Sequence, residues 1–144
     1  MPSRIHAQHG ASTAMTITLA SLASSTAGVG KQTTLVSNDD DAQMVRVYFK
    51  VTTGTTPTAN KSIQFYLITG DDPSSSNIRT DNAGASDAGI TILSARLVNV
   101  VQTNSTSNTT YRDSFLIRNP GREWGIAIVH DTVANLHATA GNHE

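Results

Sequence analysis

The chain has 144 residues, a length typical of one domain with one hydrophobic core, and it contains no cysteine, which excludes disulfides, thiolate metal sites and cysteine nucleophiles. Its formal net charge of −1 provides no overall basic field that would draw it onto nucleic acid or an anionic membrane. The 15 Ser and 20 Thr, beside only 2 Glu, favour strands and turns over helices and predict an all-β protein.

Residues 1–38 carry only two formal charges, both basic, and are predicted to form an extended N-terminal arm that is loose over residues 1–14. Its apolar residues are interrupted by Thr, Ala and Ser, whereas the core of a secretory signal is a continuous apolar block. The alternation fits a short strand at least as well as it fits a secretory signal. We expect this apolar side to dock on the body of the protein or on a neighbouring subunit. It consists of Met15, Ile17, Leu19 and Leu22.

The stretch GVGKQTT, residues 28–34, shares a Gly-Lys pair with phosphate-binding loops. Ser25 and Gln32 occupy the positions where that motif needs Gly and Ser or Thr, so a flexible turn is predicted instead. No run in the chain approaches the roughly 20 apolar residues that cross a membrane.

Residues 39–144 are predicted to form a single β-sandwich domain. Apolar residues recur at every second position of 44–51, as they do in a half-buried strand, and again in 63–68. The two strands are expected to form a pair joined by the polar connector 53–60, and the turn residues of GDDPSSSN, 70–77, are expected to end the second strand.

Three further segments complete the predicted strands. Residues 90–102 are long enough for one strand or for two strands joined by a bend near Ser94, and both possibilities stay open. Residues 111–119 predict a short strand, and 123–131 predict a strand with three large apolar side chains on one face: Trp124, Ile126 and Ile128. At least six strands separated by turns are typical of an antiparallel β-sandwich with a jelly-roll-like arrangement.

Two groups of residues are candidate metal ligands. His6 and His9 lie in HAQH, near the start of the chain, without a third ligand, and a loose arm explains them. The runs Asp39–Asp41 and Asp71–Asp72 offer oxygen ligands for calcium, but they lack the alternating ligands, central Gly and terminal Glu of a helical calcium loop. The first run is expected to solvate a turn and to block edge pairing, so no metal site is predicted.

Candidates for catalysis are equally sparse. His130 and Asp131 suggest a base with its orienting acid, and Ser94 or Ser114 would be the nucleophile, yet adjacent strand residues point to opposite faces and no Gly-x-Ser-x-Gly elbow occurs. Two Glu residues leave little for a carboxylate pair that hydrolyses sugars. We therefore expect a protein that is not an enzyme, with no catalytic residue and no cofactor.

A glycan-binding module stays open as an alternative. Trp124, Tyr48 and Tyr66 are able to stack on sugar rings, although Trp124 is expected first in the core.

Four segments together resemble one family of proteins: TTGTTPTANKSIQFYLI, SDAG, TSNTTY and FLIRNPGREWGIAIVHDTVANLHATAGNHE. Over residues 35–144 the chain resembles small structural proteins of tailed bacteriophages that decorate or cement the capsid. The matching positions are Thr53–Ala59, Lys61–Ile63, Trp124–Ile126 and Leu136–His143. Such relatives continue past the Asn-His pair with one more apolar strand, whereas the present chain has only Glu144 after it.

The resemblance implies a decoration or cement protein on the capsid surface of the virion. Its expected partners are the major capsid protein and further copies of itself, as a homodimer or homotrimer, with no nucleic acid, membrane or small-molecule substrate. The expected contact residues are those of the apolar side of the arm, and Thr55, Thr56 and Thr58 of the connector. Another virion component (a head fibre, tail or receptor-binding part) and a glycan-binding β-sandwich remain as alternatives.

Overall fold

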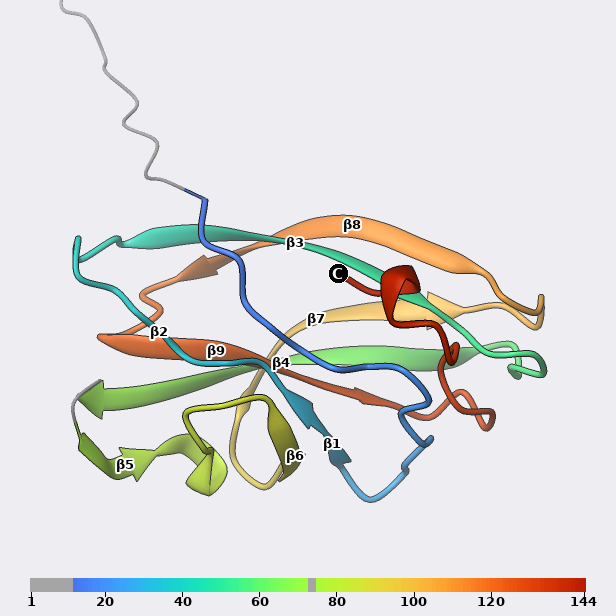
Figure 1. Ribbon diagram of the computed structural model, residues 1–144, viewed down its shortest axis with the longest axis horizontal. Coiled ribbons are helices and arrows are strands. Elements are labelled where there is room, and N and C mark those ends of the chain that lie inside the picture. Colours follow the sequence, from blue (N-terminus) through green and yellow to red (C-terminus); the bar gives the residue numbers. More distant parts are fainter. Residues whose placement is uncertain (1–11, 73–74) are drawn as a thin grey trace, which may run out of the picture.

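The computed structural model describes residues 12–72 and 75–144, and this part of the chain is built from strands with two single-turn 3-10 helices (Figure 1). The strands are β1 Val29–Gln32, β2 Val36–Ser37, β3 Met44–Thr52, β4 Lys61–Asp72, β5 Ser75–Arg79, β6 Ala88–Thr91, β7 Arg96–Thr103, β8 Thr110–Arg118 and β9 Glu123–His130. The 3-10 helices are η1 Thr80–Asn82 and η2 Ala140–Asn142. Within the described ranges, no helix has the length and apolar character needed to span a membrane.

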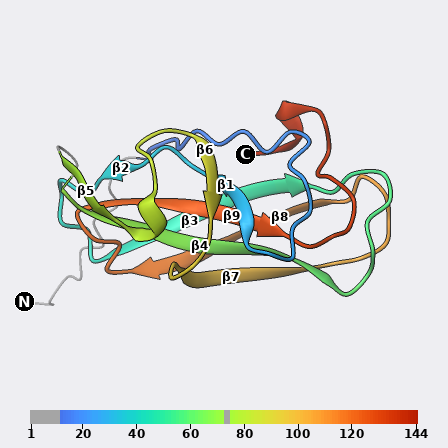
Figure 2. The same ribbon diagram turned by 90° about the horizontal axis from the view of Figure 1, so that it is seen from below.

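The strands form two antiparallel sheets. In the larger sheet β4 and β9 are central: β5 and β7 pair with the outer edge of β4, and β1 and β2 pair with β9, with β6 beyond β1. The smaller sheet consists of β3 and β8, paired over nine residues. The sheets curl toward each other into half a barrel, with β3 and β8 as the upper layer in Figure 1 (Figures 1 and 2). The prediction of an all-β, antiparallel β-sandwich is confirmed.

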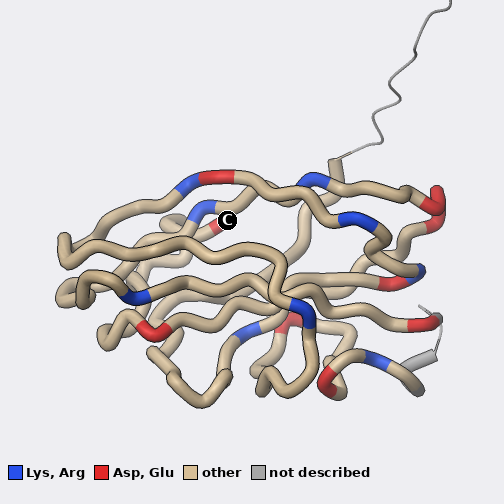
Figure 3. The backbone as a smooth tube through the Cα atoms, turned by 180° about the vertical axis from the view of Figure 1, so that it is seen from behind, with Lys and Arg blue, Asp and Glu red and all other residues tan. Residues whose placement is uncertain are grey.

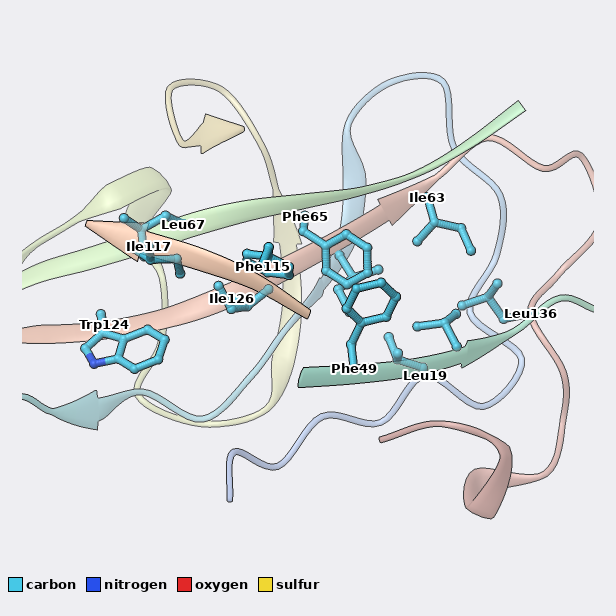
Figure 4. Close-up of a cluster of buried hydrophobic side chains, with 12 residues drawn as sticks. Leu19, Phe49, Ile63, Phe65, Leu67, Phe115, Ile117, Trp124, Ile126 and Leu136 are labelled. Carbon is cyan, nitrogen blue, oxygen red and sulfur yellow. The ribbon is translucent and has the colours of Figure 1, made fainter. Parts of the chain in front are cut away.

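The main core lies between these sheets (Figure 4). Strand alternation directs one face of β3, β4, β8 and β9 inward, and the rings of Phe49, Phe65 and Phe115 pack together with centroids 4.4–6.1 Å apart. The predicted inward face of β9 is confirmed, because Trp124, Ile126 and Ile128 all belong to this core. Ala127, on the other face of β9, packs with Ile68 in a second cluster under β6, which explains why β9 is buried along its whole length.

The N-terminal arm completes the main core of its own chain. Leu19 is only 1% exposed, and the other three apolar arm residues pack against the same cluster. Main-chain hydrogen bonds fix the arm on both sides: Thr34 N donates to Thr16 O at 2.8 Å, and Leu136 N donates to Leu22 O at 2.9 Å. The arm therefore docks on the body, one of the two destinations expected from sequence.

The composition boundary at residue 38 does not coincide with a boundary of the sheet. β1 and β2 lie within residues 29–37 and pair with β9, so this segment belongs to the sandwich. The predicted flexible turn at residues 28–34 is wrong for the same reason, since residues 29–32 form β1. Gly30 permits the strand to approach its neighbour closely, because a Cβ at this position would lie 2.2 Å from Ile128 O.

Three strand predictions change in the structure. The strands of residues 44–51 and 63–68 do not pair with each other: β3 pairs with β8, and the connector crosses to the other sheet. The prediction was wrong because alternation in the sequence specifies the buried face of a strand and not its partner. β4 does not end at residue 70 but continues through Gly70 to Asp72. A Cβ on Gly70 would lie 2.4 Å from Glu123 Oε2 on the neighbouring strand. Residues 90–102 resolve into the end of β6, a bend that contains Ser94, and β7.

Candidate interaction site

Three loops and the arm meet at one end of the sandwich around a depression of about 500 Å3, which we call the end pocket. It lies where β3 leaves toward β4 and where the chain continues after β9, on the right in Figure 1. The residues that line it come from four separate segments: Ser21, Gly54, Thr55, Thr56, Asn108, Val133, Ala134, Asn135, Leu136, His137 and Ala138.

The connector 53–60 is held in one conformation by its neighbours. Asn108 N donates to Gly54 O at 2.9 Å, Ser107 Oγ donates to Thr55 O, and Thr58 N donates to Thr132 O at 3.0 Å. Pro57 is buried at the centre of the connector. Because the main chain is bonded at several points, the exposed threonine side chains of the connector sit on a rigid support.

The segment after β9 forms the opposite wall of the end pocket. Leu136 is buried in the main core and forms a bridge with Thr53. A Cβ on Gly54 would lie 2.2 Å from Asn135 O, so only glycine permits this approach of the two chains. The close contact explains the glycine of the connector.

Three residues of the end pocket have left-handed backbone conformations without being glycine. Ser21 has a φ of 57°, Asn108 of 55° and Val133 of 75°. Asn adopts this conformation readily, whereas a β-branched residue does so only under strain. Val133 N donates to Ser24 Oγ at 3.0 Å, which helps to hold the strained residue in place.

A buried histidine joins the arm to the segment after β9. His130 is 1% exposed; its Nε2 lies 2.9 Å from Leu22 O in the arm, and its Nδ1 lies 2.9 Å from Thr132 Oγ1. A carbonyl oxygen only accepts, so Nε2 carries the proton. Burial lowers the pKa of His130, and the bond to Leu22 O and the charge of Asp131 oppose that shift only in part. The neutral imidazole is therefore a structural tie between the arm and the segment after β9.

The chemistry available in the end pocket is neutral hydrogen bonding. Hydroxyl and amide side chains dominate its polar lining, and its one titratable residue, His137, accepts hydrogen bonds at Nδ1 from Thr139 N at 3.1 Å and Asn142 Nδ2 at 2.9 Å. None of the lining residues is Asp, Glu, Lys or Arg. Such a surface suits contact with main-chain and neutral polar groups of a partner.

The residues weighed for catalysis are not assembled into one site. Asp131 accepts hydrogen bonds from Ser62 N at 2.6 Å and Ser62 Oγ at 3.2 Å, and it has no hydrogen bond to His130. Ser94 Oγ donates to Asp81 at 2.7 Å, and Ser114 Oγ accepts from Arg46 at 3.1 Å. Each serine therefore has a structural partner, in a different part of the sandwich from the histidine.

The residues weighed as metal ligands are likewise dispersed. Asp39–Asp41 and Asp71 are exposed, and the side chain of Asp72 lies outside the described part, as do His6 and His9. No group of three or more His, Asp or Glu side chains suited to a metal ion occurs among the residues that the structure describes.

The aromatic residues weighed for glycan binding lie in three separate environments. Trp124 is in the main core, as expected, and Tyr66 packs against the second cluster with its hydroxyl donating to Gln64 at 2.7 Å. Tyr48 is 73% exposed on the outer face of β3. The three rings do not form a common stacking platform.

The predicted contact residues fall into two groups. Thr55 and Thr56 line the end pocket, and Thr58 is exposed beside it. The four arm residues are packed in their own chain, and their part in contacts with another subunit stays a prediction. The segment 133–138 was not among the predicted contact residues; its one indication in the sequence is that it overlaps the stretch Leu136–His143, which carries part of the resemblance.

The fold and the end pocket together define a small antiparallel β-sandwich with a rigid, neutral polar surface at one end. Comparisons with protein-family models, curated proteins and solved structures give no match to this chain.

Proposed function

We propose that this protein decorates the outside of a bacteriophage capsid and stabilises the shell through contacts with the major capsid protein and with other copies of itself. The resemblance of residues 35–144 to capsid decoration proteins motivates the proposal. The observation that carries it is the connector 53–60, whose main chain is fixed by hydrogen bonds from two other loops while Thr55, Thr56 and Thr58 remain exposed. A preformed surface loses little conformational entropy when it binds.

The neutral character of the end pocket fits this role. A shell is reinforced by many copies, each making weak contacts, and the number of copies raises the total binding strength far above that of one contact. Hydroxyl and amide groups are sufficient for such contacts, and no reactive group is needed.

The test has two stages. First, labelling or cryo-electron microscopy of virions should show the protein spread over the head; a location at one vertex would instead assign it to the tail or to a fibre, and absence from the virion would contradict the proposal. Second, capsids stripped of the protein should bind it again in a sedimentation assay.

A double variant, Thr55→Arg with Thr56→Arg, should reduce rebinding at least tenfold, because two long charged side chains would have to be buried against the partner. Thr13→Arg changes an exposed threonine away from the end pocket and is the matched control. Equal rebinding of the double variant and the control would remove the connector from the contact surface.

A further inference from the structure

The outer face of the β3–β8 sheet is open along most of its length. The C-terminal segment covers only its Thr52 end, where Lys50 Nζ donates to Gly141 O at 3.0 Å and Thr52 Oγ1 donates to Asn142 O at 2.9 Å. The inward side chains of β3 and β8 fill the main core, so the alternating residues point outward. We call these outward residues the ribbon face: Met44, Arg46, Tyr48 and Lys50 of β3, and Thr110, Arg112, Ser114, Leu116 and Arg118 of β8. Figure 3 shows basic residues recurring along this layer, at the top of the view.

The ribbon face holds positive charges that have no carboxylate partner. All three lysines of the chain form ion pairs, with Asp87, Glu144 and Asp131. In contrast, Arg46, Arg112 and Arg118 have no ion pair among the described residues. Arg112 lies directly opposite Lys50 in the register, an arrangement of like charges that costs stability. Glu144 offsets part of that cost, because its carboxylate lies 3.3 Å from Lys50 Nζ, and an anionic partner beside Arg112 would offset the rest.

Large apolar groups separate these charges. Tyr48 is 73% exposed, Met44 53% and Leu116 48%. Arg, Tyr and Met are the residue types enriched at protein interfaces, and unpaired Lys, which is depleted there, does not occur on this face. The mixture therefore favours a protein partner over a nucleic acid, which would be expected to select a continuous basic track.

The chain itself carries the complementary charge. Asp39, Asp40 and Asp41 are exposed in the turn that precedes Met44, at one end of the ribbon face, and have no ion pair within the described ranges. The turn is held in place by Asn38, whose side-chain amide accepts from Ala42 N at 2.9 Å and donates to Gly121 O at 3.0 Å. A fixed acidic group thus stands at the opposite end of β3 from the Lys50–Arg112 pair.

We propose that two copies of this chain associate through their ribbon faces about a two-fold axis, with β3 of one copy antiparallel to β3 of the other. Met44 and Lys50 are six residues apart, or about 20 Å along the strand. The two-fold arrangement places the acidic turn of each copy against Arg112 of its partner. Tyr48 and Leu116, near the middle of the face, pack around the axis, and the same patch serves both copies, as a two-fold interface requires.

The size of the ribbon face sets the strength of this dimer. Two paired strands of nine residues cover about 30 Å by 10 Å, or roughly 300 Å2 per copy, against about 800 Å2 per partner in a stable complex. The dimer is therefore weak and salt-sensitive in dilute solution, and a high local concentration favours it. The inference rests on the proposed function in one respect, since it names the surface for contacts between copies; it is tested on the purified protein alone, so its failure would leave the contact with the capsid protein untouched.

Sedimentation equilibrium at protein concentrations up to about 1 mM in low salt tests the inference, since that range reports a dissociation constant as weak as about 1 mM. The wild type should form a dimer that dissociates as salt is added. Arg112→Glu should weaken the dimer at least tenfold, as should a triple variant of the acidic turn, Asp39→Lys, Asp40→Lys and Asp41→Lys. Gln102→Glu, an exposed residue of β7 outside the ribbon face, is the control and should leave the dimer unchanged.

Mixing the two charge-reversed proteins gives the decisive result. Each acidic turn would again face a basic side chain, and each basic turn an acidic one, so the mixture should form a heterodimer more strongly than either variant associates alone. All substituted side chains are exposed, and unchanged circular dichroism and unfolding midpoints would confirm that the variants fold. A monomeric wild type at about 1 mM, or a mixture that fails to associate, would overturn the inference.

Discussion

Leu19→Ala tests whether the arm is part of the folded core. Leu19, in the arm, lies in the main core beside Phe49 of β3 and Leu136 of the segment after β9 (Figure 4). The substitution removes three carbon atoms, worth about 2.4 kcal/mol at about 0.8 kcal/mol for each buried group. A partly unfilled cavity adds to this, and measured Leu-to-Ala costs in cores span about 2–5 kcal/mol.

We expect a loss of about 3 kcal/mol in the free energy of unfolding. The value lies toward the lower part of the range because the arm is attached by only a few main-chain bonds and is able to collapse into the space. Urea unfolding followed by circular dichroism measures the effect, and an unchanged m-value would show that the change is in the native state. Thr13→Ala is the control, since an exposed arm residue should alter stability by less than about 0.5 kcal/mol.

A loss below about 0.5 kcal/mol for Leu19→Ala would refute this reasoning. It would mean that the arm contributes nothing to the monomer in solution. If the same variant then weakened self-association, the arm would act between subunits, which is the other destination expected from its sequence.

Three further predictions concern buried or capping groups. Glu123→Gln removes the counter-charge of the buried Arg79 and replaces one of its two acceptors at 2.8 Å by an NH2 group, which should cost about 3–5 kcal/mol of unfolding free energy. A double substitution of both residues to Leu should recover much of that loss in the same urea assay. The lowered pKa of His130 means that the unfolded chain binds the proton at a higher pH than the folded protein does. The free energy of unfolding should therefore fall as the pH drops below about 6.5 and level off below the pKa of the folded protein. His130→Gln should remove part of that slope in urea midpoints measured from pH 8 to 5. Burial alone would raise the pKa of Asp81, but hydrogen bonds from Ser94 and the neighbouring main chain lower it. Asp81→Ala should therefore cost about 1–2 kcal/mol of unfolding free energy and speed amide exchange at residues 93–95. Asp81→Asn should cost less, because Asn tolerates the φ of 55° at this position.

The sequence predicts strands and their buried faces because both are local properties. The alternation in residues 44–51 specifies which side chains of β3 enter the core, and the same holds for β9. Strand partners are not local: β3 pairs with β8, about 60 residues further along the chain, and no pattern within either strand encodes that choice. The glycines were misinterpreted for a related reason, since close approach to another strand requires the three-dimensional neighbour to be known.

The end pocket was beyond prediction because it is made of ordinary residues. Ser21, Thr55, Asn108 and Asn135 come from four segments, and each segment alone has the composition of a polar loop. Nothing in their spacing marks them as a group, unlike a metal or catalytic motif whose ligands must recur at set intervals. The connector threonines were predicted as contact residues only because of the resemblance to capsid proteins and because of their position in a loop.

The arm and the end pocket are physically coupled, which affects how their roles can be separated. A two-stranded sheet is too narrow to cover the larger sheet, so the arm and the segment after β9 fill the remaining side of the core. His130 and the bond from Leu136 N to Leu22 O join these two segments directly. Removal of the whole arm would therefore alter the pocket as well as any contact made by the arm itself. Point substitutions distinguish the two: Leu19→Ala perturbs the support, whereas Thr55→Arg changes the surface and leaves the support intact.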